Sequence, residues 1–338
     1  VYLDAQCALR TALYHKLGIP VVLVEMMPLS LYDPWVPPFT SGLIPKQTSI
    51  SRLGIRLAWE KIVIARKIRN LFFSMLLCRQ DYFSLYKRLF LECGFPFEEK
   101  IDWRRPFIIG IKESKILSMN PSSLDFPRKY PPNCQYAPSR VDLTREDPML
   151  NQRYARVMEE VCLQKQQRPD TKIIYCFSST VMGFEKRSKI IFMKIRDICL
   201  RNPQFVFILS VGKYHNTSYL LPCPSNLYVF QQVPQLHLLS YCDLMITSGG
   251  MNSVAECIEK EVPMLVCPLS LKSDQLGNSA RVVYHGLGLR ARIKLDSSRT
   301  IEKRIVQLFE NYATFKRNLS MMRTKILAES TAINTEVI

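Results

Sequence analysis

Residues 243–256, DLMITSGGMNSVAE, run from an apolar segment through two glycines into a stretch with helical character. Gly249 and Gly250 permit a tight turn before a helix that we expect to begin near Asn252. The start of a helix presents unpaired N–H groups and a partial positive charge, which favour a phosphate group. The segment therefore predicts a phosphate site to which Asn252 and Ser253 add polar side chains. The alternative is a plain turn in which these two side chains only cap the helix.

From residue 172 onward, short apolar runs alternate with amphipathic stretches. Apolar runs separated by helices of about 10 to 15 residues predict parallel strands that are covered on both faces. The sequence therefore predicts a doubly wound α/β domain, in which ligands bind beyond the carboxyl ends of the strands. The expected strands are KIIYCF, FVFIL, NLYVF, LMIT and PMLVC, and the expected helices cover 187–201, 234–241, 252–260 and 274–285.

The N-terminal half has weaker signals of the same kind. VVLV (21–24) and PFIIG (106–110) are typical of buried strands, and a long helical region lies between about 52 and 95. Residues 121–150 contain six prolines and little periodicity, which favours a connection between two domains.

The composition limits the classes of partner that the chain can have. The 338 residues include 46 Lys and Arg against 29 Asp and Glu, a formal net charge of +17 that favours nucleic acid, an acidic membrane surface or a phosphorylated ligand. No nucleic-acid recognition motif accompanies the charge, so we expect no such partner. The 11 scattered cysteines, without a C-x-x-C pair, favour reduced thiols in a cytoplasmic chain. No apolar run reaches the roughly 18 residues that span a bilayer, which leaves a soluble chain or one attached at a membrane surface.

Residues 226–288 hold several motifs in a fixed order: V-P-Q, a strand, G-G-x-N-S, a glutamate, V-P-x-x-x-x-P and D-Q-x-x-N. This order resembles the donor-binding signature of family 1 glycosyltransferases, the UDP-glucosyl and UDP-glucuronosyl transferase group. The resemblance implies a GT-B fold with two Rossmann-like doubly wound lobes. It implies a partial N-terminal acceptor lobe at 1–130, a linker at 131–170 and a nucleotide-sugar lobe at 171–338.

The resemblance also implies roles for individual side chains. Gln235, whose amide offers a donor and an acceptor, would read the uracil edge, and Glu256 would accept the ribose hydroxyls. Asp274 and Gln275 would bind the transferred sugar. The residues implied around the diphosphate are Ser179, Ser248, Gly249, Gly250, Asn252 and Ser253.

Simpler interpretations of these residues exist. Glu256 could lie on a solvated helix face, Asp274 could be a helix N-cap, and Gln235 could be a turn residue. The chain also departs from the family pattern. Ser248 replaces a histidine at the phosphate, Gln232 replaces a tryptophan that stacks on the base, and Ser178 and Glu261 replace glycines.

The general base is not apparent in this sequence. Family members use a histidine in the first strand–helix loop with an aspartate partner, and Asp4 falls where that aspartate usually sits. The earliest histidine, His15, lies in a helix-like stretch, so we expect the base to precede Val1 in the native protein. No D-x-D motif is present and the family needs no metal, so we expect neither a metal nor another cofactor.

Residues 52–79 predict an amphipathic helix with a possible membrane role. Its apolar face would hold Leu53, Leu57, Ile64, Ile68, Leu71 and Met75. On the opposite face, Arg52, Arg56, Arg66 and Lys67 would flank Trp59 and Val63. Basic residues interleaved with tryptophan favour an anionic membrane surface. The alternative is an ordinary packed helix with a basic, solvated side.

Together, these patterns predict an inverting glycosyltransferase. It would move a sugar from a nucleoside diphosphate sugar, with a UDP-sugar as the expected donor, to a hydroxyl of a lipophilic small molecule or lipid. Peripheral attachment to a membrane is part of the prediction. Two alternatives remain: a sugar-nucleotide epimerase of the same fold, and a non-catalytic nucleotide-binding partner subunit.

Overall fold

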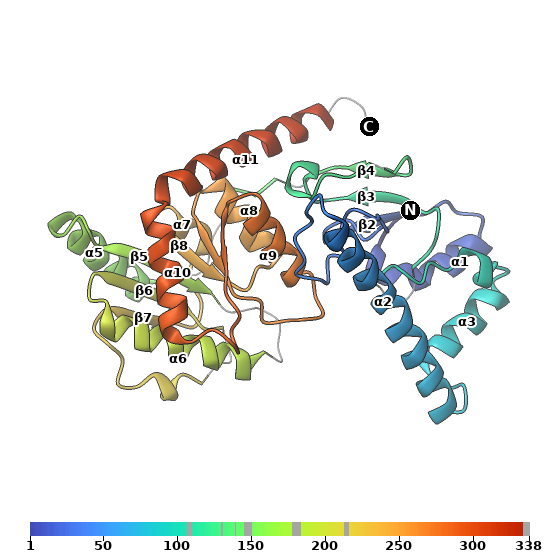
Figure 1. The fold of residues 1–338 in the computed structure, drawn as a ribbon, viewed down its shortest axis with the longest axis horizontal. Coiled ribbons are helices and arrows are strands. Elements are labelled where there is room, and N and C mark those ends of the chain that lie inside the picture. Colours follow the sequence, from blue (N-terminus) through green and yellow to red (C-terminus); the bar gives the residue numbers. More distant parts are fainter. Residues whose placement is uncertain are drawn as a thin grey trace. The chain divides into compact units, whose positions relative to one another are not determined.

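The computed structural model describes residues 1–106, 110–129, 131–138, 140–144, 151–177, 184–212 and 216–333. The chain divides into two compact units. The N-terminal unit comprises Val1–Ser139 with Ile326–Ile338, and the C-terminal unit comprises Arg140–Lys325. Each unit is built around its own parallel sheet (Figure 1).

The C-terminal sheet has the strand order β10-β9-β8-β5-β6-β7, and all its pairs are parallel. Its strands are β5 (Lys172–Phe177), β6 (Phe205–Ser210), β7 (Leu227–Phe230), β8 (Leu244–Thr247), β9 (Met264–Val266) and β10 (Gly288–Arg290). In the centre, Ile174 of β5 pairs with Phe207 on one side and with Leu244 on the other. Chain order runs outward in both directions from this centre, so the boundary between β5 and β8 is the topological switch point.

Helices cover both faces of this sheet. The helices of the unit are α5 (Gln152–Gln167), α6 (Glu185–Arg201), α7 (Gln235–Leu239), α8 (Met251–Glu259), α9 (Gln275–Tyr284), α10 (Ser298–Glu310) and the part of α11 (Tyr312–Ile333) up to Lys325, with the short η3 (Ser218–Leu220). Ile195 of α6 and Ile305 of α10 pack with Phe207 in one buried core. On the other face, the Tyr175 hydroxyl donates to Gln235 at the start of α7. The doubly wound lobe predicted from the sequence is thereby confirmed.

The N-terminal unit has a smaller parallel sheet, in the order β1-β2-β3-β4. Its strands are β1 (Tyr2–Asp4), β2 (Val22–Glu25), β3 (Lys115–Ser118) and β4 (Cys134–Tyr136). Its helices are η1 (Ala5–Arg10), α1 (Thr11–Lys16), α2 (Ser49–Leu76), α3 (Tyr82–Glu92), α4 (Phe97–Lys100) and η2 (Ser122–Leu124). The helical region expected between about 52 and 95 is thus two helices. Three residues of the strand expected at 106–110 lie outside the described residues.

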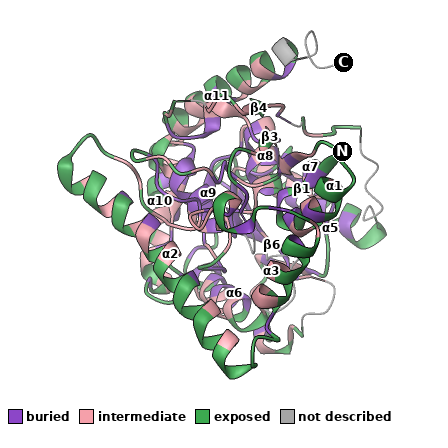
Figure 2. Cartoon of the chain, turned by 90° about the vertical axis from the view of Figure 1, so that its right-hand side faces the viewer, coloured by how far each residue is buried: buried purple, intermediate pink, exposed green. Residues whose placement is uncertain are grey.

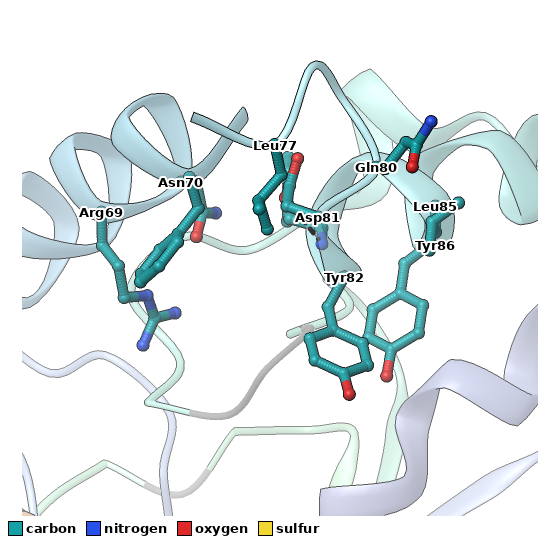
Figure 3. Close-up of a pocket in the computed structure, with 10 residues that line it drawn as sticks. Arg69, Asn70, Leu77, Gln80, Asp81, Tyr82, Leu85 and Tyr86 are labelled. Atoms are coloured by element: carbon teal, nitrogen blue, oxygen red, sulfur yellow. Dashed lines mark hydrogen bonds between the residues drawn. The ribbon is translucent and has the colours of Figure 1, made fainter. Parts of the chain in front are cut away.

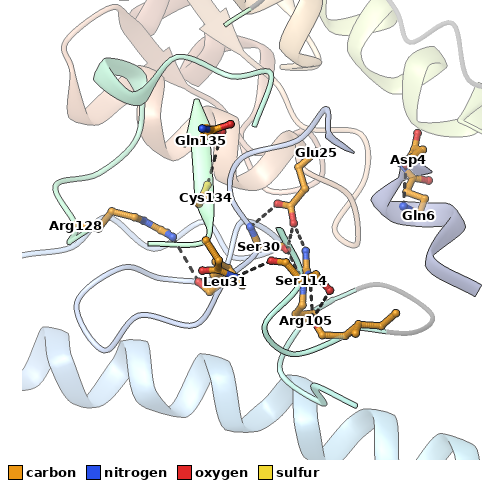
Figure 4. A network of polar contacts seen from close by, with 12 residues as sticks. Asp4, Gln6, Glu25, Ser30, Leu31, Arg105, Ser114, Arg128, Cys134 and Gln135 are labelled. Carbon is orange, nitrogen blue, oxygen red and sulfur yellow. Dashed lines mark hydrogen bonds and ion pairs between the residues drawn. The ribbon is translucent and has the colours of Figure 1, made fainter. Parts of the chain in front are cut away.

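A buried polar network ties this sheet to a distant loop (Figure 4). The Glu25 carboxylate forms an ion pair with Arg105, and both side chains are almost completely buried. Glu25 also accepts the Ser30 N–H and hydroxyl at 2.9 and 2.8 Å, and Arg105 Nε donates to Ser30 Oγ at 3.1 Å. Because a buried charge is costly without partners, the network holds residues 25, 30 and 105 in one arrangement.

The division of the chain can be compared with the expected one. Helix α5 occupies much of the stretch expected as a linker at 131–170. The last residues, from Ile326, cluster with the N-terminal unit although the expected C-terminal lobe reached 338. Within the N-terminal unit, the Glu329 carboxylate accepts the N–H groups of Ser122 and Ser123, each at 2.8 Å. These bonds satisfy the first N–H groups of η2.

Helix α2 is oriented oppositely to the expectation. Its buried residues are Ile55, Trp59 and Arg66, so the face expected to carry Trp59 to a membrane packs inward. The six residues of the expected apolar face, Leu53, Leu57, Ile64, Ile68, Leu71 and Met75, are 55–66% exposed. The assignment of Trp59 and Arg66 to a lipid-facing surface is therefore wrong. The alternative of a packed helix is confirmed by the buried Ile55, Trp59 and Arg66, and its solvated side carries exposed basic residues together with the six apolar ones.

Candidate functional site

The candidate site lies at the carboxyl ends of β5 and β8, where the strand order reverses. Open parallel sheets bind ligands at this position. The residues that follow β8 are Ser248, Gly249 and Gly250, which lead directly into α8. The loop that follows β5 contains Ser178 and Ser179, and both lie outside the described residues.

The two glycines of the turn differ in what they require. Gly249 has a φ of +85°, and a Cβ atom there would lie 2.6 Å from Val266 Cγ1. Gly250 has a φ of −63°, and a Cβ atom would meet nothing within 4 Å. Gly249 is thus needed by the fold itself. A side chain at Gly250 would instead occupy open space at the mouth of α8.

The start of α8 has no side-chain cap among the described residues. The helix begins at Met251, its N-cap is Gly250, and no side-chain hydrogen bond from the described part of the chain closes its first turn. Asn252 and Ser253 therefore lie inside the first turn, and the interpretation of both as N-caps is wrong. Asn252 is exposed, whereas Ser253 and Ser248 are buried beside the turn.

Gln235 is held by three buried partners. Its Nε2 donates to Glu256 Oε2 at 2.6 Å and to Ser253 Oγ at 3.4 Å, and its Oε1 accepts the Tyr175 hydroxyl at 3.0 Å. Burial raises the pKa of Tyr175 well above its usual range, so the phenol stays a donor. Glu256 is only 6% exposed, so it does not lie on a solvated helix face. Gln235 begins α7 rather than a plain turn, and the two N–H groups of its amide are directed at Glu256 and Ser253.

Asp274 and Gln275 lie at the start of α9 but have different surroundings. Gln275 Oε1 accepts the N–H groups of Leu269 and Ser270, each at 2.8 Å, so this side chain shapes the loop after β9. Asp274 occupies the N-cap position of α9, yet its side chain makes no capping hydrogen bond. Instead, Asp274 Oδ2 accepts from Asn278 Nδ2 at 2.9 Å.

Burial raises the pKa of the Asp274 carboxyl, and the hydrogen bond from Asn278 partly opposes this rise. A carboxyl in this setting is costly to ionise in the ligand-free protein. A ligand hydroxyl that donates a hydrogen bond to the Asp274 carboxylate would lower that cost, because such a bond stabilises the ionised form.

Asn278 connects the two halves of the site and was not singled out from the sequence. Its Nδ2 donates to Gly249 O at 2.9 Å as well as to Asp274, so one amide joins the turn after β8 to the start of α9. Thr247 supports the same turn, because its Oγ1 accepts the Gly249 N–H at 3.2 Å. The asparagine of the D-Q-x-x-N motif, one helical turn after Asp274, was the available signal.

Asp4 lies in the other unit, at the end of β1. Its Oδ1 accepts the Gln6 N–H at 2.7 Å, so Asp4 caps η1. Its role as partner of a general base stays a prediction. His237 forms a hydrogen bond with the Tyr154 hydroxyl at 2.9 Å, as a structural histidine does.

Two parallel-sheet units, one of them doubly wound with polar residues at its switch point, are the features of the GT-B fold. Known proteins agree with this class. Residues 216–328 match the family model described as UDP-glucoronosyl and UDP-glucosyl transferase. The predicted resemblance to the family 1 glycosyltransferases is confirmed, and the matched residues lie almost entirely in the C-terminal unit.

Individual relatives and structures are similar to the chain over different lengths. An NDP-glycosyltransferase, YjiC, of Bacillus subtilis (strain 168) is 37% identical over 98 residues, 29% of this chain and 24% of that protein. A zeaxanthin glucosyltransferase of Pantoea ananas is 27% identical over 217 residues, 64% of this chain and 46% of that protein. The chain therefore covers less than half of the length of either relative.

The solved structures show the shared fold. The glycotransferase of kitacinnamycin superposes with a TM-score of 0.62 at 17% identity, covering 97% of this chain and 72% of that one. The spinosyn rhamnosyltransferase SpnG complexed with thymidine diphosphate gives a TM-score of 0.59 at 17% identity, covering 99% and 71%.

Proposed function

We propose that the chain binds a nucleoside diphosphate sugar at the switch point of its C-terminal sheet and takes part in inverting glycosyl transfer. The observation that carries the proposal is the start of α8, which opens at the switch point without a side-chain cap. Its N–H groups and helix dipole favour the negative charge of a diphosphate. Open space beside Gly250 lets the phosphate approach the backbone closely.

The neighbouring side chains fit the rest of such a donor. Glu256 and Gln235, already hydrogen bonded to each other, would face the ribose and the base. Asp274 would accept a hydroxyl of the sugar and orient its anomeric carbon, and Asn278 would hold Asp274 in place. Orientation of this kind accounts for much of the rate in group transfer.

In the proposed reaction, the acceptor oxygen forms a bond to the anomeric carbon while the bond from that carbon to the diphosphate breaks. Attack from the face opposite the diphosphate inverts the configuration. The acceptor proton passes to a general base. The negative charge that develops on the departing diphosphate is stabilised by the start of α8.

We infer that the acceptor is a lipophilic hydroxyl compound. Support comes from the large apolar surface of the N-terminal unit and from the printed name of one relative, a zeaxanthin glucosyltransferase. An acceptor of this kind collects in membranes, so we also infer that the chain attaches peripherally to one.

Titration calorimetry with UDP and with UDP-glucose tests the donor site. Glu256→Ala should weaken both ligands alike, whereas Asp274→Ala should weaken only UDP-glucose, by about 1.5 to 3 kcal/mol for a lost hydrogen bond to a charged group. Glu259→Ala is the matched control, because Glu259 lies on the same helix but pairs with Arg323 at 2.8 Å. If the control and Glu256→Ala behave alike, the site has been assigned to the wrong residues.

Product analysis separates the remaining alternatives. A glycosyltransferase transfers the sugar only when an acceptor is present. Epimerisation or hydrolysis of UDP-glucose without an acceptor would indicate the epimerase. Binding without turnover by the complete native protein, with acceptor present, would indicate a non-catalytic partner subunit.

A further inference from the structure

We propose that the N-terminal unit docks on an anionic lipid bilayer through the solvent-facing side of α2. This surface, the α2 stripe, consists of Leu53, Leu57, Ile64, Ile68, Leu71 and Met75. The proposal concerns the N-terminal unit and does not depend on the donor site.

The α2 stripe is a continuous apolar surface rather than a set of scattered side chains. Its members recur three, four or seven residues apart along a helix of 28 residues, so they lie on one side of it. Figure 2 shows α2 coloured as exposed along much of its length. Phe72 and Leu76 extend the surface towards the end of the helix and are 54% and 61% exposed. Single exposed leucines are ordinary, but a contiguous patch of this kind marks an interaction site.

The helix cannot rotate to bury the stripe without breaking buried hydrogen bonds. Trp59 is 1% exposed, and its Nε1 donates to Val36 O at 2.9 Å. Two turns further on, the buried Arg66 guanidinium donates to the backbone oxygens of Arg105, Trp103 and Asp102, the first at 2.8 Å. These contacts fix the side of α2 that faces the core, so the stripe is the side left outward.

The charges on α2 point to the chemistry of the partner. Helix α2 carries six basic residues and a single acidic one, Glu60, whose carboxylate is 3.3 Å from Arg104. Arg56 and Lys67 lie along one edge of the stripe, Lys61 lies along the other, and all three are exposed. Long basic side chains can lie along an apolar surface and place their charges at the headgroup level of a membrane. Apolar side chains flanked by cations are the pattern of a helix that lies in the plane of an anionic interface.

A hollow lies beside the far end of α2, on the side of the helix that carries the buried Arg66 rather than on the stripe (Figure 3). It has a volume of about 730 Å³ and lies between the end of α2 and the start of α3. Its apolar lining includes Phe73, Leu77 and Leu85, and Arg69 and Tyr82 stand at its polar side. Asn70, Phe73 and Leu77 follow Arg66 by 4, 7 and 11 residues and share its side of the helix, so the hollow faces α3 and is separate from the stripe.

A second copy of the chain fits this surface less well than a bilayer does. In a two-fold symmetric dimer, the same surface of each copy meets its equivalent, so cations along the two stripes would be brought together. Protein interfaces are also depleted of lysine at their centres, whereas the stripe has lysines along both edges. Anionic headgroups instead neutralise these charges.

Flotation with lipid vesicles tests the proposal. The probes are vesicles of phosphatidylcholine alone and of phosphatidylcholine with 30% phosphatidylglycerol, a content of about one anionic lipid in three that gives a negative surface potential. We expect the chain to float with the anionic vesicles at least about tenfold more than with neutral ones, and to lose most of this binding in high salt. The double variant Ile64→Asp with Ile68→Asp should lose it as well.

The matched control carries the same two charges elsewhere. Leu200→Asp with Leu295→Asp changes two leucines of the C-terminal unit that are 62% and 72% exposed, so it should float like the unmodified chain. Circular dichroism and UDP binding of both double variants show whether each is folded, independently of flotation. Equal flotation of the two double variants would overturn the proposal. So would a dimer in solution that the Ile64/Ile68 variant dissociates while the unmodified chain does not float.

Discussion

Helices α6 and α2 have the same kind of apolar periodicity and opposite fates. In α6, Ile195 and Ile198 are completely buried against the C-terminal sheet. In α2, Ile64 and Ile68 are more than half exposed. The comparison teaches that periodicity predicts a helix and the side on which its apolar residues gather. Whether that side is buried depends on what the rest of the fold places beside it.

Buried polar side chains also have different roles in the two units. In the C-terminal unit, the buried polar side chains Glu256, Gln275 and Asn278 gather at the mouth of the sheet. In the N-terminal unit, the buried Arg66 and Arg105 bind to backbone oxygens and a carboxylate within the core. Buried polar groups thus mark a candidate ligand site in one unit and a structural core in the other.

Truncating one isoleucine in each helix should give the largest contrast. Ile195→Ala should lower the free energy of unfolding by about 2 to 5 kcal/mol, because it leaves a cavity in a packed core. Ile68→Ala should change it by less than about 0.5 kcal/mol, as expected for an exposed position. Urea titrations of both variants measure the difference. Similar losses would mean that the α2 stripe is packed in solution and would break the comparison.

The two glycines of the site provide the next comparison, between a glycine that the fold requires and one that the ligand requires. Gly249→Ala should cost about 2 to 4 kcal/mol, from a left-handed backbone and the contact with Val266. Gly250→Ala should leave stability nearly unchanged but weaken UDP, because its methyl group enters open space at the start of α8. Thermal unfolding and calorimetry on the pair separate the two roles. If Gly250→Ala binds UDP normally, the phosphate does not approach that backbone.

Arg66 and Lys67 are adjacent on α2 and should respond differently. Arg66→Met leaves backbone oxygens of residues 102–105 without their donor, and we expect a loss of about 1 to 3 kcal/mol. Burial lowers the pKa of Arg66 to about 10, which shows that the buried guanidinium carries its charge less favourably than it would in water. Removing the charge therefore offsets part of the loss. Lys67→Met should leave stability unchanged and reduce binding to anionic vesicles. If both substitutions reduce vesicle binding and leave stability unchanged, α2 has the orientation expected from its sequence.

Asp274→Asn should have a small effect on stability, and the sign of that effect tests the cause of the raised pKa. Because the pKa of Asp274 is raised in the folded state, ionisation of this carboxyl opposes folding, and stability is lost as the pH rises through the folded pKa. The asparagine variant should therefore be more stable than the unmodified chain at neutral pH. The advantage should shrink as the pH falls below that pKa. Asp170→Asn, at an exposed position, is the control. An advantage that does not depend on pH would exclude burial of the charge as its cause.

The sequence by itself determined most of the C-terminal unit. Apolar runs such as KIIYCF and LMIT are long enough to predict buried parallel strands, and the order of motifs across 226–288 predicts the family and the place of the site. Gly249 could be singled out because a glycine pair between a strand and a helix is a local signal. These features rest on interactions between residues that are close in the chain, so the sequence records them directly.

Only the tertiary structure decided which side of α2 faces the core, because Trp59 and Arg66 find partners from 23 to 39 residues away. Strands β3 and β4, of four and three residues, gain their stability from neighbouring strands and have almost no periodic signal of their own. The contacts of Gln235 with Glu256 and of Asn278 with Gly249 likewise join separate elements. Such contacts are selected by packing and by the need to satisfy buried polar groups, and both depend on residues that meet only after the chain has folded.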